Sequence, residues 1–167
     1  SISFSSFPRF LKSLKKRSDF ILLRNEKREP LNFKHLFLDF DGVLTDNKVL
    51  TFNDGTEQVS SSKEDSLALS IIKSLGNNAY ILTSETNEVV QKRADKLKIE
   101  VFKGISNKRK MIEKIIENKG LERDQIVYVG NDLNDMGIFN SDIFCCCPSD
   151  SAAVSYTHLR AHETDHD

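Results

Sequence analysis

Two aspartates separated by one residue, Asp39 and Asp41, follow the short apolar run 36–38. Carboxylates at positions i and i+2 of a loop can face one space, where repulsion raises a pKa unless a cation or a shared proton lies between them. Magnesium suits that place, because it takes oxygen ligands and keeps waters and a substrate phosphate in its shell. One carboxylate can then attack phosphorus while the other transfers protons. An Asp-x-Asp pair beside a turn also occurs on ordinary surfaces, so other residues must decide between these interpretations.

Three further places in the chain carry groups that suit phosphoryl transfer. Thr83, with Ser84 beside it, follows a second apolar run, and its hydroxyl can donate to a phosphoryl oxygen or cap the next helix. Lys108 lies at a predicted helix start, where its charge can stabilise a phosphoryl group or face solvent. The run 130–135, Gly-Asn-Asp-Leu-Asn-Asp, offers more oxygen ligands. Four such places in this order rarely arise by chance, and together they favour a catalytic site.

The hydrophobic pattern predicts the elements that position these groups. Short apolar runs predict four strands, at 36–38, 79–82, 99–102 and 126–129. Apolar residues at helical spacing predict three helices between them, at 67–75, 87–98 and 107–119. This alternation predicts an α/β fold with a doubly wound parallel sheet and helices on both faces. Ligands in such folds bind at the carboxyl ends of the strands, where the acids occur.

Smaller features refine this architecture. Gly76 and Gly120 lie just past two predicted helix ends. Residues 48–60 are predicted to form a small β-hairpin, because they carry an Asp54-Gly55 turn signal between apolar positions. On the second helix, four residues are predicted to face inward: Val89, Val90, Ala94 and Leu97.

The composition indicates a globular protein without a general attraction for anions. Of the 167 residues 38% are hydrophobic and 29% charged, and the formal net charge is -1. We therefore expect neither disorder nor binding to nucleic acid or a membrane. No apolar run approaches the roughly 18 residues of a membrane span, and no signal-peptide pattern opens the chain. The consecutive Cys145, Cys146 and Cys147 suit neither a disulfide framework nor a zinc site, so we interpret them as apolar filling and expect a cytoplasmic location.

The chain divides into three segments. Residues 1–33, rich in Ser, Lys and Arg, are interpreted as a linker or N-terminal extension. Residues 34–154 hold every group described above and are predicted to form one domain. Residues 155–167 place three histidines along one helical stripe, but the sequence resembles a translated sequencing adapter, so we interpret it as a non-native tail. A start at Ser1 favours a fragment of a longer protein.

The four places resemble the motifs of the haloacid dehalogenase (HAD) superfamily of phosphohydrolases. Asp39-Phe-Asp41-Gly-Val-Leu-Thr45 is similar to the first motif, and Thr83, Lys108 and the run 130–135 are similar to the second, third and fourth. The resemblance implies a Rossmann-like HAD core and Mg2+ as cofactor.

The same resemblance implies roles for individual residues. Asp39 would be the nucleophile and a magnesium ligand, and Asp41 the acid/base, with its carbonyl as a second ligand. Thr83 and Lys108 would hold the phosphoryl group. Further magnesium ligands would come from the fourth motif: Asn131, Asp132 and Asp135.

A closer similarity is to the branch of 3-deoxy-D-manno-octulosonate 8-phosphate phosphatase, which also holds nine-carbon ulosonate phosphatases and the phosphatase-like domain of some acylneuraminate cytidylyltransferases. It covers the first motif through Asp46, the Asp54-Gly55 hairpin, Lys63-Glu-Asp65 and the segment 127–132. Members lack a large cap domain, and their hairpin serves in homotetramer assembly. The resemblance implies a phosphorylated sugar-acid substrate and these contact residues: Gly42, Asp65, Ser84 and Glu85.

Two positions depart from that branch. Asn131 stands where the fourth motif usually has an acid, so its amide oxygen would be a weaker magnesium ligand unless Asp132 replaces it. Ser84-Glu85 replaces the Gly-Arg of the octulosonate enzymes and is more similar to the nine-carbon and cytidylyltransferase-linked members.

Alternative functions therefore stay open. The first is a magnesium-dependent phosphatase that hydrolyses an eight- or nine-carbon ulosonate phosphate through an aspartyl-phosphate. The second is a weakly active or inactive tetramerisation domain fused to an acylneuraminate cytidylyltransferase. A phosphotransferase or phosphate-binding regulator on the same fold is a third, since fold alone does not fix function.

Overall fold

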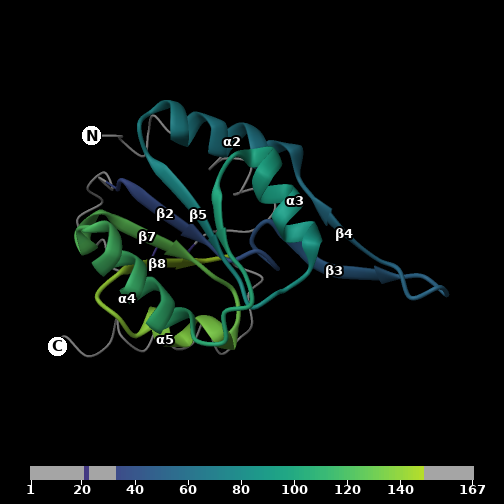
Figure 1. Ribbon diagram of the computed structural model, residues 1–167. Helices are drawn as coiled ribbons and strands as arrows, with labels where there is room; N and C mark the ends of the chain where they lie inside the picture. The colour runs from purple at the N-terminus through teal and green to yellow at the C-terminus, as the bar shows by residue number, and fades with distance from the viewer. Residues whose placement is uncertain (1–20, 23–32, 149–167) are drawn as a thin grey trace.

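A computed structural model describes residues 21–22 and 33–148 of the chain (Figure 1). Apart from Ile21–Leu22 and Phe33, the predicted linker 1–33 lies outside the described residues, and so do the tail histidines. The predicted domain boundaries at 34 and 154 therefore stay predictions.

Six strands form one sheet in the order β1-β8-β7-β2-β5-β6. Their bounds are β1 Ile21–Leu22, β2 His35–Leu38, β5 Asn78–Leu82, β6 Glu100–Phe102, β7 Ile126–Val129 and β8 Phe144–Cys147. All neighbours pair in parallel except β1, which runs antiparallel to β8. The four predicted strands are confirmed, whereas β1 and β8 were not predicted. The cysteine run was interpreted as filling rather than as a strand.

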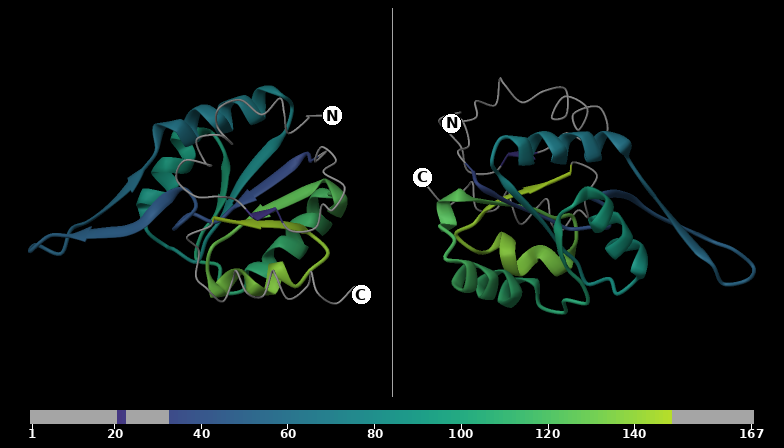
Figure 2. Two further views of the ribbon diagram at one scale, coloured as in Figure 1. Left: turned by 180° about the vertical axis from the view of Figure 1, so that it is seen from behind. Right: turned by 45° about the horizontal axis from the view of Figure 1, so that its top comes forward.

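Helices cover both faces of the sheet, as predicted. They are α2 Lys63–Ser74, α3 Glu88–Leu97, α4 Lys108–Lys119 and the short α5 Met136–Phe139, with 3-10 turns η2 Arg123–Gln125 and η3 Leu133–Asp135. Figures 1 and 2 show α2 and α3 on one face and α4 and α5 on the other. Helix α2 begins earlier than predicted, because the Ser62 side chain accepts from the Glu64 N–H and caps it. None of the helices in the described ranges is long and apolar enough to cross a membrane.

Side-chain alternation along the strands divides the core into two layers. Leu36 and Leu38 of β2 pack in the layer of α2 and α3, whereas Phe37 packs in the layer of α4 and α5. Cys146 faces the first layer, and its two neighbours on β8 face the second. All three cysteines are buried among the apolar residues of these layers, as their interpretation as apolar filling predicts.

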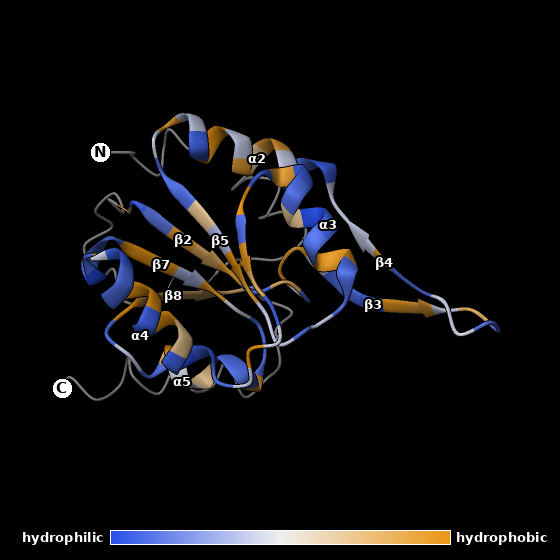
Figure 3. Cartoon of the chain, viewed as in Figure 1, coloured by the Kyte–Doolittle hydropathy of each residue, from blue (hydrophilic) through white to orange (hydrophobic). Residues whose placement is uncertain are grey.

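One prediction about helix orientation is wrong. Val90, Ala94 and Leu97 of α3 are buried as expected, but Val89 is 36% exposed. Val89 lies in the first turn of α3, beside the open pocket described below, and therefore lines that pocket. Figure 3 shows α3 as mostly hydrophilic with apolar bands, whereas hydrophilic and apolar bands alternate along α2.

The predicted hairpin is confirmed and projects from the body of the domain (Figures 1 and 2). It comprises β3 Thr45–Thr51 and β4 Glu57–Ser61. Its turn is closed by the Phe52 N–H donating to the Thr56 carbonyl at 2.8 Å, and Gly55 has a φ of 82° that favours glycine. Within 33–148 the segment between β2 and α2 holds only this hairpin, so no large cap domain is inserted there.

The order of the strands fixes where a ligand can bind. From β2 the chain proceeds outward to β5 and β6, and it then returns to β7 on the opposite side of β2. The strand order therefore reverses between β2 and β7, and the carboxyl ends of strands at such a point form the usual binding crevice of an open α/β sheet.

Candidate active site

An open pocket of about 340 Å³ lies at the carboxyl ends of β2, β5 and β7. Its lining comes from the loops after these strands, from α3 and from the hairpin. Among the lining residues are the predicted catalytic and metal-binding groups Asp39, Asp41, Thr83, Asn131 and Asp132. The tertiary structure thus brings together groups that lie far apart in the sequence.

Asp39 is the first residue after β2 and is almost completely buried, with 6% of it exposed. Its N–H donates to the Val129 carbonyl at 2.9 Å, which ties it to β7. Its Oδ1 accepts from the Phe40 N–H at 2.7 Å, and its Oδ2 lies 2.8 Å from Lys108 Nζ. Burial, followed by the charge of Asp135, raises the pKa of Asp39 to about 6 against the opposing effect of Lys108. The carboxylate is therefore fixed in orientation and poorly hydrated.

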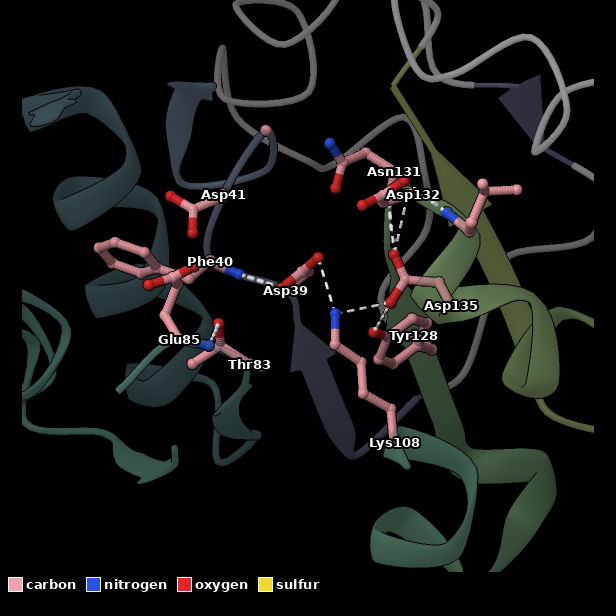
Figure 4. A network of polar contacts seen from close by, with 12 residues as sticks. Asp39, Phe40, Asp41, Thr83, Glu85, Lys108, Tyr128, Asn131, Asp132 and Asp135 are labelled. Atoms are coloured by element: carbon pink, nitrogen blue, oxygen red, sulfur yellow. Dashed lines mark hydrogen bonds and ion pairs between the residues drawn. The ribbon is translucent and has the colours of Figure 1, made fainter. Parts of the chain in front are cut away.

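Lys108 begins α4 and lies beneath the pocket rather than in solvent. Its Nζ contacts both Asp39 Oδ2 and Asp135 Oδ1 at 2.8 Å, and only 3% of the residue is exposed (Figure 4). Burial lowers the pKa of Lys108, but the charges of Asp39 and Asp135 outweigh it and raise that pKa above its usual value. The lysine therefore carries a positive charge beside the candidate nucleophile.

Asp135 organises the loop that follows β7. Its Oδ2 accepts the N–H groups of Asn131 and Asp132 at 2.8 and 3.1 Å. Its Oδ1 accepts from the Tyr128 hydroxyl at 2.6 Å and from Lys108. Gly130 permits this approach, since a Cβ there would lie 2.4 Å from Asp135 Oδ2. Both oxygens of Asp135 are thus engaged in hydrogen bonds that hold the loop and the lysine, and its predicted metal contact stays a prediction.

Asp41 lies on the other side of Asp39 from this network, as Figure 4 shows. Burial raises the pKa of Asp41, and a hydrogen bond from the Thr45 hydroxyl at 3.3 Å opposes that effect. The same hydroxyl accepts from the Gly42 N–H at 3.2 Å, which closes the turn after Asp41. A carboxyl group with a raised pKa at a pocket wall is suited to carry a proton.

Gly42 and Asn131 touch across the site. Gly42 has a φ of 75°, and a Cβ at this position would lie 1.9 Å from Asn131 Nδ2. The glycine therefore leaves the space into which the Asn131 side chain fits. The resemblance implied a substrate contact for Gly42, which lies against Asn131 and not among the residues that line the pocket, so this contact stays a prediction.

The loop after β5 supplies a hydroxyl and an acid. Thr83 is 1% exposed, and its Oγ1 accepts from the Glu85 N–H at 3.1 Å, so its own proton can still be donated. Ser84 and Glu85 line the pocket, as their predicted substrate contacts require. Asp65 lies in the first turn of α2 outside the pocket lining, so its substrate contact stays a prediction.

The oxygen donors at the pocket fit a magnesium ion. No group of three or more His, Cys, Asp or Glu side chains with metal-binding geometry occurs within the described ranges. Magnesium does not require one, because it is usually held by one or two carboxylates with waters and substrate phosphate completing its shell. Asp39 can supply a carboxylate oxygen and Asp41 its backbone carbonyl oxygen, and Asn131 and Asp132 supply further oxygens on the facing loop.

Sequence reasoning missed two contributions to the site. Tyr128 was not proposed as a site residue, although it lies on β7 only two residues before Gly130. The hairpin residues Asn47, Val49, Glu57 and Val59 also line the pocket. Their spacing of two on each strand places them on one hairpin face, and that signal was present in the sequence.

The comparisons with known proteins agree with this geometry. No family model matches the chain. A crystal structure of a HAD family hydrolase from Streptomyces avermitilis is 35% identical, has a TM-score of 0.72 and is matched over 75% of this chain and 72% of that chain. The present chain belongs to the HAD family of hydrolases. A 3-deoxy-D-manno-octulosonate 8-phosphate phosphatase from Moraxella catarrhalis, solved with a magnesium ion, a phosphate ion and KDO, is 27% identical with a TM-score of 0.62, over 65% and 63% of the two chains.

Two curated relatives of this HAD family member are longer than the matched region. The 3-deoxy-D-manno-octulosonate 8-phosphate phosphatase of Salmonella typhi is 29% identical over 105 residues, which are 62% of this chain and 56% of the relative. N-acylneuraminate cytidylyltransferase A of Danio rerio is 25% identical over 138 residues, which are 80% of this chain and 32% of the relative. The chain thus spans about half of the first relative and a third of the second.

The contact between Gly42 and Asn131 gives a first prediction. In Gly42→Ala the added Cβ displaces Asn131, so we expect the apparent magnesium affinity to fall about tenfold or more. Gly55→Ala is the matched control, because Gly55 has a similar φ of 82° with nothing within 4 Å of the added Cβ. Magnesium-induced shifts in melting temperature and magnesium titrations of activity measure the effect. Equal magnesium affinities of Gly42→Ala and Gly55→Ala would contradict a role of this contact in metal binding.

The pKa of Asp39 gives a second prediction, for protein kept free of metal with a chelator. In the folded state the pKa of Asp39 is raised to about 6 from its ordinary value of 3.8. Between these values the folded state binds more protons than the unfolded state, so the free energy of unfolding rises as pH falls. Relative to Asp39→Asn, wild type should gain up to about 3 kcal/mol across this window. Urea unfolding at a series of pH values tests this, and parallel curves for both proteins would contradict it.

Proposed function

We propose that the chain is a magnesium-dependent phosphatase that hydrolyses the phosphate monoester of an ulosonate sugar acid through an aspartyl-phosphate. The observation that carries the proposal is the placement of Lys108 Nζ against buried Asp39, 2.8 Å from its Oδ2, beneath a pocket that also exposes a second carboxylate, Asp41. A nucleophile, a neutralising charge and a proton carrier thus meet where a phosphate can enter.

In the first half-reaction an Asp39 oxygen attacks phosphorus, and the bond from phosphorus to the leaving oxygen breaks. Lys108 stabilises the negative charge of the nucleophile and of the transferring group, and Thr83 donates its hydroxyl proton to a phosphoryl oxygen. Asp41, whose pKa is raised by burial, gives a proton to the leaving alkoxide.

In the second half-reaction a water molecule attacks the aspartyl-phosphate. Asp41 is now a carboxylate and takes a proton from this water, which restores its protonated form. The bond between phosphorus and Asp39 breaks, inorganic phosphate leaves and the free carboxylate returns. Water enters from the open pocket, and the same acid therefore serves both half-reactions.

Magnesium would be held by Asp39, Asp41 and Asn131, with Asp132 as the alternative to Asn131. When bound, it supplies positive charge that offsets repulsion between the carboxylates and the incoming phosphate. Asp135 is left out of this set, because Lys108, Tyr128 and two backbone N–H groups occupy its oxygens.

The sugar-acid substrate is supported by the relatives named above, which include enzymes acting on an octulosonate phosphate. Which eight- or nine-carbon compound is used would depend on the outer pocket, where Ser84, Glu85 and the hairpin residue Glu57 provide polar contacts. Assembly as a homotetramer is part of the proposal. It is supported by exposed apolar side chains on the projecting hairpin, among them Leu50 at 59% and Phe52 at 48%.

A second candidate is a phosphatase-like assembly domain within a longer cytidylyltransferase. The match to the Danio rerio enzyme, which covers 80% of this chain, favours it, as does the loss of one acid at Asn131. In that case the purified chain would assemble into an oligomer while hydrolysing no ulosonate phosphate above the level of Asp39→Asn.

Substitution of the two aspartates tests the chemistry. Asp39→Asn should abolish turnover, because an amide does not attack phosphorus, and residual activity within tenfold of wild type would exclude the assignment. Asp41→Asn should lose far less activity on p-nitrophenyl phosphate, whose leaving group needs little protonation, than on a sugar phosphate. Steady-state rates on both substrates provide the comparison. Equal losses of Asp41→Asn on the two substrates would argue against its acid role.

Magnesium titrations of two neighbouring variants test the metal ligands. Asn131→Asp adds a charge to a buried side chain at the pocket and should lower the magnesium concentration for half-maximal activity. Asp132→Asn should have a smaller effect, because Asp132 is exposed and its Oδ1 accepts from the Leu133 N–H, a capping role that Asn also fills. Magnesium-dependent melting temperatures give a readout independent of activity. If only Asp132→Asn lost its magnesium dependence, Asp132 rather than Asn131 would be the magnesium ligand.

A further inference from the structure

Tyr128 is a fully buried residue of β7 whose hydroxyl belongs to the charged network beneath the pocket. The hydroxyl donates to Asp135 Oδ1 at 2.6 Å, and Lys108 Nζ donates to the same oxygen at 2.8 Å. Lys108 is in turn shared with Asp39 Oδ2 at 2.8 Å. A chain of contacts therefore runs from a core tyrosine to the candidate nucleophile (Figure 4).

A buried tyrosine hydroxyl generally needs a hydrogen-bond partner, so a purely structural role for this contact has to be considered. The sheet carries a second tyrosine, Tyr80 of β5, in register with Tyr128 and suitable for comparison. Phe37 of β2 pairs in register with Tyr128 on one side and with Tyr80 of β5 on the other. All three rings pack in one core layer, but Tyr80 has no part in the Asp135 network. What separates the two tyrosines is the contact of the Tyr128 hydroxyl with Asp135.

We propose that Tyr128 is a positioning residue for the reaction, whose hydroxyl shares Asp135 Oδ1 with Lys108 and so keeps the lysine divided between Asp135 and Asp39. The proposal rests on the phosphatase function proposed above. Tyr128 touches neither substrate nor nucleophile and acts through Lys108.

The physical reason is the saturation of Asp135. Its Oδ2 is engaged by two backbone N–H groups, so its Oδ1 is satisfied by Tyr128 and Lys108 together. Without the phenol proton, Lys108 is the one remaining side-chain donor to Asp135 Oδ1 among the described contacts. In a buried site the attraction between the two remaining charged groups strengthens. Lys108 then shifts toward Asp135 and away from Asp39, where its charge is needed.

Tyr128→Phe removes the hydroxyl and keeps the ring in the core. We expect kcat to fall about tenfold, with KM changed less than about twofold, because a hydrogen bond to a charged group is lost without altering the pocket wall. Tyr80→Phe is the matched control and should change both constants less than about twofold. Cooperative thermal unfolding of each variant verifies the fold. Equal kinetics of the two variants would overturn the proposal.

A double-mutant cycle separates action through Lys108 from an independent effect. In a Lys108→Met background, Tyr128→Phe should reduce single-turnover rates less than about twofold further, because the lysine it positions is absent. A full additional tenfold loss would overturn the proposal. A crystal structure of Tyr128→Phe gives a readout without activity, in which Lys108 Nζ should have left Asp39 Oδ2. An unmoved lysine contradicts the inference, whereas an inactive wild type contradicts the proposed function.

Discussion

The burial of one positive charge, that of Lys108, governs the arrangement of this domain. An ammonium group removed from water is costly unless it is paired and hydrogen-bonded, and here two carboxylates at 2.8 Å provide both. The pairing joins the end of β2, the start of α4 and the loop after β7. Each partner is itself fixed by backbone N–H groups, so the lysine has little freedom. Electrostatic stabilisation by such fixed charges requires little rearrangement when charge develops in a reaction.

The sheet makes this pairing possible. Because β2 lies between β5 and β7, the loops that follow these three strands open at one edge, and α4 returns from β6 beneath them. Glycines at 42 and 130 then allow approaches that any side chain would block. The hairpin contributes the outer wall of the pocket from the same chain. The packing of these loops thus brings the charged groups together in one small volume, and a shift in any one of the loops would separate them.

Much of this was predictable from local sequence. Buried parallel strands read as continuous apolar runs, so β2, β5, β6 and β7 were found, and glycines past helix ends marked the limits of α2 and α4. Strand β8 was missed, because a run of cysteines has no distinctive periodicity when both faces of a strand are buried. The side chain of Val89 was placed inward, because a valine at the first turn of a helix cannot be assigned to core or pocket without knowing what lies opposite.

The sequence alone determined the class of the fold, the position of the acids at strand ends and the resemblance to HAD phosphohydrolases, since these depend on residue type and on spacing along the chain. Only the tertiary structure decided which groups touch. It joined Asp135 to the loop and to the lysine, placed Gly42 against Asn131, and brought Tyr128 into the charged network. These outcomes depend on distances of a few ångströms between elements that meet only when the sheet forms, and spacing in the sequence does not encode such distances.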